Sequence, residues 1–156
     1  MLPAQHVDQM TLQRVREMIR GNFATRDRLY ASAEALDDDA LAEICRRLAD
    51  GLGGNAADLQ QLLMIAGEQP AEPNEADKVA RQLQEIVTDM LEDRHGQSAV
   101  LSEAASAEQR LKREYDNAID ATPNNEVKGL LRRQREDVAF GETVLQKVRE
   151  TGEETK

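Results

Sequence analysis

The sequence lacks tryptophan and contains only one cysteine, four prolines, two tyrosines and two phenylalanines among 156 residues. The single cysteine, Cys45, excludes an internal disulfide and a cysteine-based zinc cluster, and it fits a reducing compartment. Because aromatic and β-branched residues are scarce, the core has to be aliphatic, and a β-rich fold is excluded. The abundance of Ala, Leu, Glu, Arg and Gln instead predicts an all-α domain.

Basic residues are also scarce: 20 of them stand against 30 acidic residues, which gives a net charge of −10. This charge repels phosphates and anionic lipids, so we expect no nucleic-acid and no membrane partner. The basic cluster Arg132, Arg133 and Arg135 is followed directly by Glu136 and Asp137, as on a solvated helix face. The N-terminus lacks a secretory pattern and no apolar run approaches the ~20 residues of a membrane span, so we expect a cytoplasmic protein.

Apolar residues recur at steps of three and four in four long segments, which predicts four amphipathic helices. The first runs from Met10 to Leu36, the second from the Asp37-Asp38-Asp39 cap to Gly67, the third from Ser98 to Thr122, and the fourth contains Val127 to Val148. A shorter amphipathic helix is expected in the long connection between the second and third helices. Its apolar residues are Val79, Leu83, Ile86, Val87, Met90 and Leu91. We therefore expect one domain over residues 1–156, with a core of about residues 10–150, folded as a four-helix bundle with an additional short helix.

The second helix has a predicted buried stripe that is polar in its middle. The stripe is Leu41, Ile44, Leu48, Gly51, Asn55, Asp58, Leu62 and Ile65. Gly51, Gly53 and Gly54 each weaken the helix by about 1 kcal/mol relative to Ala, so they suggest a kink or the close approach of a helix from this bundle or another subunit.

The two hairpins resemble a family of small bacterial four-helix-bundle proteins of the ferritin-like superfamily, a domain without an assigned function. In the first hairpin the resemblance rests on Met18-Ile19, Ser32-Ala33-Glu34, Ala40-Leu41 through Ala49, and Asp58-Leu59 to Gly67 and Pro70. In the second it rests on Ala99-Val100-Leu101, Glu103, Glu108, Tyr115, Leu130-Leu131, and Gln134 through Val138. The chain departs from the family at Ala57, where members carry histidine, and at Ala107, where they carry glycine. The resemblance covers about residues 12–150 and implies a ferritin-like bundle without an established activity.

Metal-binding ferritin-like bundles hold two ions with a Glu from each of two helices and a Glu-x-x-His from each of the other two. This sequence contains no Glu-x-x-His, and we assign no site to its two histidines, His6 and His95. The weak metal candidates, for iron or manganese, are Asp58, Glu108, Glu34 and Glu142. We predict no catalytic residue and no cofactor, because Cys45 has no nearby histidine and Gly51 to Gly54 match no phosphate-binding loop.

Four polar residues fall near the middle of their helices on the predicted core side. They are Arg26, Asp58, Glu108 and Gln134, with Asn22 and Asn55 one turn away. Since a guanidinium repels metal cations and pairs with carboxylates, we expect Arg26 to pair with Glu108, Asp58 or both inside the bundle. The alternatives are that these side chains reach water at the edge of the stripe, or that they hold a metal.

Three functions are compatible with this pattern. The leading one is a non-enzymatic bundle that self-associates or scaffolds a partner, with a homodimer favoured because the short helix carries more apolar surface than one bundle contact consumes. The second is a degenerate di-metal carboxylate protein. The third is a small-molecule or helix-binding module in which the polar layer and Gly51 to Gly54 line a groove.

Overall fold

The computed structural model describes residues 8–71 and 96–154, and these form four long helices. They are α1 (Gln9–Ala35), α2 (Asp39–Ile65), α4 (Gly96–Ala121) and α5 (Asn125–Glu154). The predicted helices are confirmed to within a few residues, and the four-helix bundle is confirmed with them. The short helix expected around Val79 to Leu91 lies outside the described residues. None of the described helices combines the length and the apolar character needed to cross a membrane.

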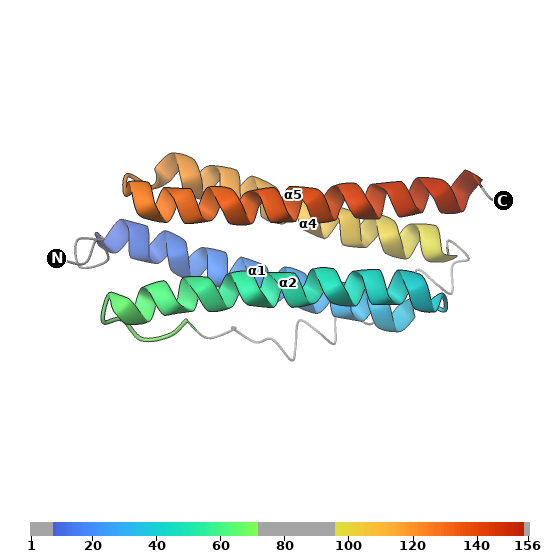
Figure 1. Cartoon of the computed structure of the whole chain (residues 1–156), viewed down its shortest axis with the longest axis horizontal. Coiled ribbons are helices and arrows are strands. Elements are labelled where there is room, and N and C mark those ends of the chain that lie inside the picture. Colours follow the sequence, from blue (N-terminus) through green and yellow to red (C-terminus); the bar gives the residue numbers. More distant parts are fainter. Residues whose placement is uncertain (1–7, 72–95, 155–156) are drawn as a thin grey trace.

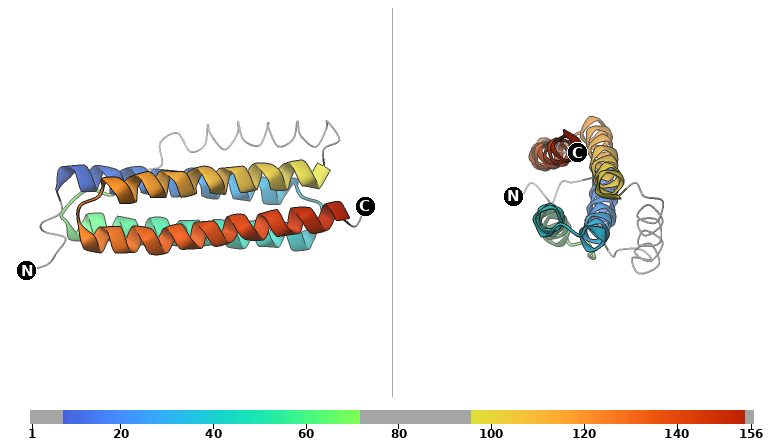
Figure 2. Two further views of the ribbon diagram at one scale, coloured as in Figure 1. Left: turned by 90° about the horizontal axis from the view of Figure 1, so that it is seen from above. Right: turned by 90° about the vertical axis from the view of Figure 1, so that its right-hand side faces the viewer.

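The bundle consists of two antiparallel hairpins, α1 with α2 and α4 with α5 (Figure 1). The hairpins meet mainly along α1 and α4, whereas α2 and α5 lie together on the other side with little contact between them (Figure 2). The C-terminal end of α2 and the N-terminal end of α4 lie at opposite ends of the bundle (Figure 1). The chain therefore passes from one end of the bundle to the other between the two hairpins.

Side-chain caps fix the starts of three helices, and the cap predicted at the acidic triplet 37–39 is confirmed at Asp38. Asp8 accepts a hydrogen bond from the backbone N–H of Thr11 (2.7 Å), and Asp38, the middle residue of the acidic triplet, accepts one from Leu41 (3.0 Å). Asn124 does the same for the first turn of α5. These bonds satisfy N–H groups that have no partner within the helix, and the carboxylates also favour the positive end of the helix dipole.

The core is aliphatic as predicted, but the buried stripe of α2 is displaced by one residue from the predicted one. Its buried residues are Ala42, Cys45, Ala49, Leu52, Asn55, Ala56, Leu59 and Leu63. The larger side chains Ile44, Leu48 and Leu62 are only half-buried, and Asp58 is exposed. The small residues face the interior because α2 packs closely on α1, and this leaves the bulkier apolar residues at the edge of the helix.

Gly51 and Gly54 of α2 do not serve close packing among the described residues, contrary to one of our expectations, and a Cβ atom at Gly53 would make only an ordinary contact with Arg26 (3.7 Å). A Cβ atom added at Gly51 or Gly54 meets nothing within 4 Å. Close approach occurs instead at Gly141 of α5, where an added Cβ would lie 3.0 Å from both carboxyl oxygens of Glu108. The absence of a side chain at Gly141 thus lets α5 pack directly on a buried side chain of α4.

Alanine substitutions at two glycines of α5 distinguish the effect of helix propensity on stability from the effect of this close packing. Gly129 has nothing within 4 Å of an added Cβ, so Gly129→Ala should stabilise the protein by up to about 1 kcal/mol. Gly141→Ala should instead destabilise it by about 1 to 3 kcal/mol, because the buried Glu108 carboxyl has to move. Denaturant unfolding of both variants measures the difference, and equal stabilisation by both would contradict the close contact at Gly141.

Candidate functional site

A buried tyrosine, Tyr115 of α4, lies at the centre of a polar layer inside the bundle. Its side chain is fully buried, at 0% exposure. Its hydroxyl accepts a hydrogen bond from Nδ2 of Asn22 on α1 (2.7 Å) and donates one to Oε1 of Gln134 on α5 (2.8 Å). One hydroxyl therefore joins three helices.

The fourth helix enters the layer through its backbone. Gln134 donates from Nε2 to the carbonyl oxygen of Asn55 on α2 (3.1 Å), and Asn22 also donates to the carbonyl oxygen of Met18 (2.7 Å). Buried polar groups are stable only when they are hydrogen-bonded, so these bonds constrain the relative heights of all four helices. Burial also raises the pKa of Tyr115 above its ordinary value, which keeps its hydroxyl protonated.

Gln134 belongs to the buried layer as expected, but the other three predicted members do not: Asp58 and Arg26 are not buried, and Glu108 is buried apart from the layer. Asp58 is exposed, because the buried stripe of α2 is displaced by one residue. Arg26 is half-buried and pairs with its neighbour Asp27 (3.0 Å), with its guanidinium 4.6 Å from the centre of the Phe23 ring. The expected pairing of Arg26 with Glu108 or Asp58 is therefore wrong, since an adjacent carboxylate and an aromatic face satisfy the guanidinium at the surface.

The residues that complete the layer were visible in the sequence without being assigned to it. Asn22 and Asn55 lie on the helical stripes one turn from the predicted layer, and Tyr115 lies on the stripe of its own helix. The signal that identifies them is their polarity at otherwise apolar positions.

Glu108 is buried apart from the polar layer, seven residues before Tyr115 on α4. Its side chain is 1% exposed, and its Oε2 atom has no hydrogen-bond partner among the described residues. Burial, and secondarily the nearby Glu142, raise the pKa of Glu108 from 4.5 to about 8. The carboxyl is therefore mostly protonated at neutral pH.

The thiol of Cys45 on α2 is also buried. Burial raises the pKa of Cys45 to about 11, and Glu108 adds to the shift. A thiol that remains protonated is a poor nucleophile and a poor metal ligand. Cys45 therefore acts as a small core residue, as the sequence predicts.

The four metal candidates do not form a site. Glu34 and Asp58 are exposed, Glu108 is buried, and Glu142 pairs with Lys112 across α4 and α5 (2.5 Å). Within residues 8–71 and 96–154, no group of three or more His, Cys, Asp or Glu side chains is placed to hold a metal ion. A di-metal centre needs several carboxylates that converge, and these four do not converge.

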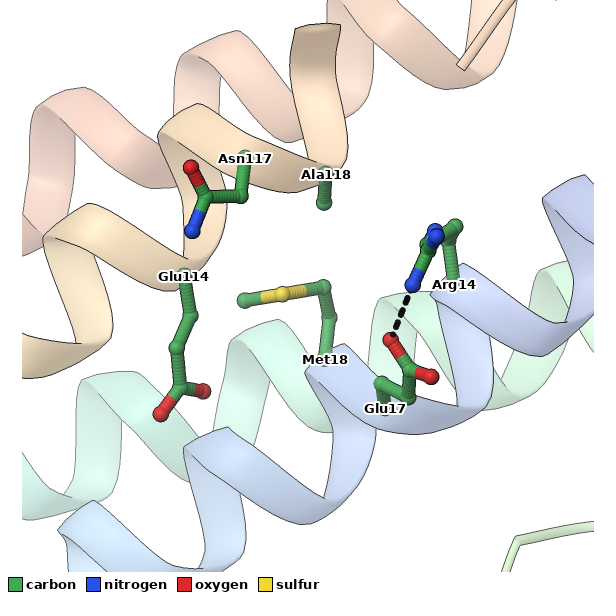
Figure 3. Close-up of a pocket in the computed structure, with 6 residues that line it drawn as sticks. All are labelled: Arg14, Glu17, Met18, Glu114, Asn117 and Ala118. Atoms are coloured by element: carbon green, nitrogen blue, oxygen red, sulfur yellow. Dashed lines mark hydrogen bonds and ion pairs between the residues drawn. The ribbon is translucent and has the colours of Figure 1, made fainter. Parts of the chain in front are cut away.

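Two hollows in the described part of the chain lie between α1 and α4. One of about 370 Å³ is lined by Arg14, Glu17, Met18, Glu114, Asn117 and Ala118 (Figure 3). A second, of about 210 Å³, shares Glu114 with it. Both are lined by residues of α1 and α4 and by none of α2, so neither is the groove beside Gly51 to Gly54 that the small-molecule alternative requires.

Glu108 should make the stability of the protein depend on pH. The folded protein keeps the Glu108 proton up to a pKa of about 8, whereas the unfolded chain loses it near 4.5. Folding therefore becomes less favourable as pH rises between these two values, by up to about 1.4 kcal/mol per pH unit, and this loss stops above about pH 8. Urea unfolding of the wild type and of Glu108→Gln between pH 5.5 and 8 measures this slope, which the variant should lose.

The control for this experiment is Glu150→Gln, which removes an exposed carboxylate from α5. It should keep the pH slope of the wild type. A wild-type slope that Glu108→Gln leaves unchanged would show that Glu108 is ionised in the folded protein.

Comparison with known proteins gives no similarity from which a function can be carried over. No family model, no curated protein and no solved structure matches this chain. The resemblance to the ferritin-like family therefore stays an expectation, and the function has to be inferred from the surfaces and contacts of the described helices.

Proposed function

We propose that this protein is a non-enzymatic, ferritin-like helical bundle that self-associates as a homodimer. The ferritin-like assignment is supported by the helix directions, because a chain that crosses the full length of the bundle between two hairpins is typical of that fold. The non-enzymatic assignment is supported by the interior, where Asn22, Tyr115 and Gln134 form a chain of hydrogen bonds that ends on the backbone of α2. Asn22 Oδ1 and Asn55 Nδ2 are the atoms of this layer without a partner among the described residues. Enzyme sites instead present polar groups to an accessible pocket.

The observation that carries the proposal is the exposure of Phe140 on α5. Its side chain is 68% exposed, the highest value among the large hydrophobic residues of the described helices. Other apolar residues of α2 and α5 are half-buried, namely Ile44, Leu48, Leu62, Leu130 and Val144. Apolar area that one copy leaves open to water is a favourable contact surface for another protein surface.

A homodimer accounts for this surface with one partner. A two-fold dimer uses the same patch on both copies, so each copy shields Phe140 of the other copy from water. Aromatic side chains contribute strongly at such contacts because they bury a large area with few rotatable bonds.

Light scattering during size-exclusion chromatography at tens of micromolar protein tests the proposal. The expected mass is twice the monomer mass of 17.4 kDa. Phe140→Ser should weaken association by about tenfold or more, because it removes an apolar contact from both halves of the interface.

The matched control is Met10→Ser, which also removes an exposed hydrophobic side chain (65%) but from α1. It should leave the mass unchanged. A wild-type protein that remains monomeric throughout this concentration range would contradict self-association.

A further inference from the structure

The side of the bundle formed by α2 and α5 carries two parallel stripes of exposed residues, which we call the α2/α5 face. On α2 the stripe is Arg47, Gly51, Gly54 and Asp58, at steps of four, three and four. On α5 it is Glu126, Arg133, Phe140 and Lys147, at steps of seven. These steps keep each set on one side of its helix.

Gly51 and Gly54 on this face have no role in the packing of the helices that the structure describes. Nothing lies within 4 Å of a Cβ added at Gly51 or Gly54, although each weakens the interior of α2 by about 1 kcal/mol relative to Ala. A residue that disfavours its own helix without a gain inside the fold is expected where another surface is contacted. Two exposed glycines one turn apart allow another helix to approach the backbone of α2.

In both stripes, positions at equal distances from the midpoint carry residues that can pair with one another. On α2, Gly51 and Gly54 are equidistant from the midpoint between Leu52 and Gly53, and Arg47 and Asp58 are equidistant from it as well. A two-fold axis through this midpoint therefore places glycine against glycine and Arg47 opposite the partner's Asp58.

On α5 the midpoint lies between Glu136 and Asp137. Phe140 and Arg133 are equidistant from it, and so are Lys147 and Glu126. The same type of axis brings Phe140 under the partner's Arg133 and Lys147 opposite the partner's Glu126. The first contact is a cation–π pair and the second an ion pair.

The two midpoints lie at the same height in the bundle. The hydrogen bond from Gln134 to the carbonyl oxygen of Asn55 fixes the register of the antiparallel helices α2 and α5. Asn55 and Gln134 are each two to three residues from their midpoint, toward the same end of the bundle. One axis therefore serves both stripes.

We propose that a second copy of this chain docks on the α2/α5 face with α2 crossing the partner's α2 antiparallel at Gly51 and Gly54. This inference rests on the proposed self-association and adds its geometry. Complementary charges are needed because two copies with a net charge of −10 each repel one another. Glu136 and Asp137, which are both exposed, flank the axis on α5 and oppose the contact.

Charge reversal on α2 tests this geometry in the full chain. Arg47→Asp and Asp58→Arg each place like charges opposite one another twice per dimer, so each should weaken dimerisation by at least about tenfold in sedimentation equilibrium. Mixing the two single variants restores opposite charges at both positions, because Asp at 47 then faces Arg at 58 and the native pair remains on the other side. The mixture should form a heterodimer with an affinity within about threefold of the wild type.

Arg46→Asp is the matched control, because Arg46 shares the partner Glu43 with Arg47 but lies outside the stripe. It should dimerise like the wild type. A wild-type dimer that is insensitive to both stripe reversals would overturn the docking geometry while leaving self-association intact. A dimer weakened by both reversals but not restored on mixing would also overturn it, whereas a monomeric wild type contradicts the proposed function itself.

Discussion

The hydrogen bonds around Tyr115 are the interaction on which the arrangement of the four helices depends. An aliphatic core has little directional preference, so apolar packing alone allows helices to slide along one another. The hydroxyl of Tyr115 forms hydrogen bonds with side chains of α1 and α5. Gln134 of α5 donates a further hydrogen bond to the backbone of α2. Sliding any helix by one turn would leave buried polar atoms without partners, and that penalty selects one register.

The same register determines what the surface can do. The contact between Gln134 and Asn55 aligns the exposed stripes of α2 and α5, so that Phe140 and the Gly51–Gly54 pair lie near one height. The buried carboxyl of Glu108 and the exposed glycines of α2 are both locally unfavourable, but for different reasons. Glu108 is a buried acid enclosed by the contact with Gly141 inside the bundle, whereas the exposed glycines of α2 have no contact inside it.

The sequence predicts helix number, lengths and caps well because these depend on local chemistry. The recurrence of apolar residues at steps of three and four, and the acidic triplet 37–39 as a cap, can be read without knowledge of the packing. The spacing of the large apolar residues such as Ile44 and Leu48 predicts a buried stripe of α2 that is displaced by one residue from the observed one. The close contact between α1 and α2 selects the small residues Ala42, Cys45 and Ala49 instead. This displacement is also the reason that Asp58 was predicted in the polar layer. The pairing of Arg26 with Asp27 depends on the rotamer of Arg26, which the spacing of residues does not specify.

The most direct test of the central role of Tyr115 is the unfolding free energy of Tyr115→Phe, compared with that of Tyr30→Phe. The first change removes the hydroxyl that satisfies Asn22 and Gln134 in the core, and the second removes an exposed hydroxyl that bonds Asp50. We expect Tyr115→Phe to lose about 1 to 3 kcal/mol and Tyr30→Phe to lose less than about 1 kcal/mol. Equal, small losses in both variants would contradict the conclusion that the buried layer holds the four helices in register.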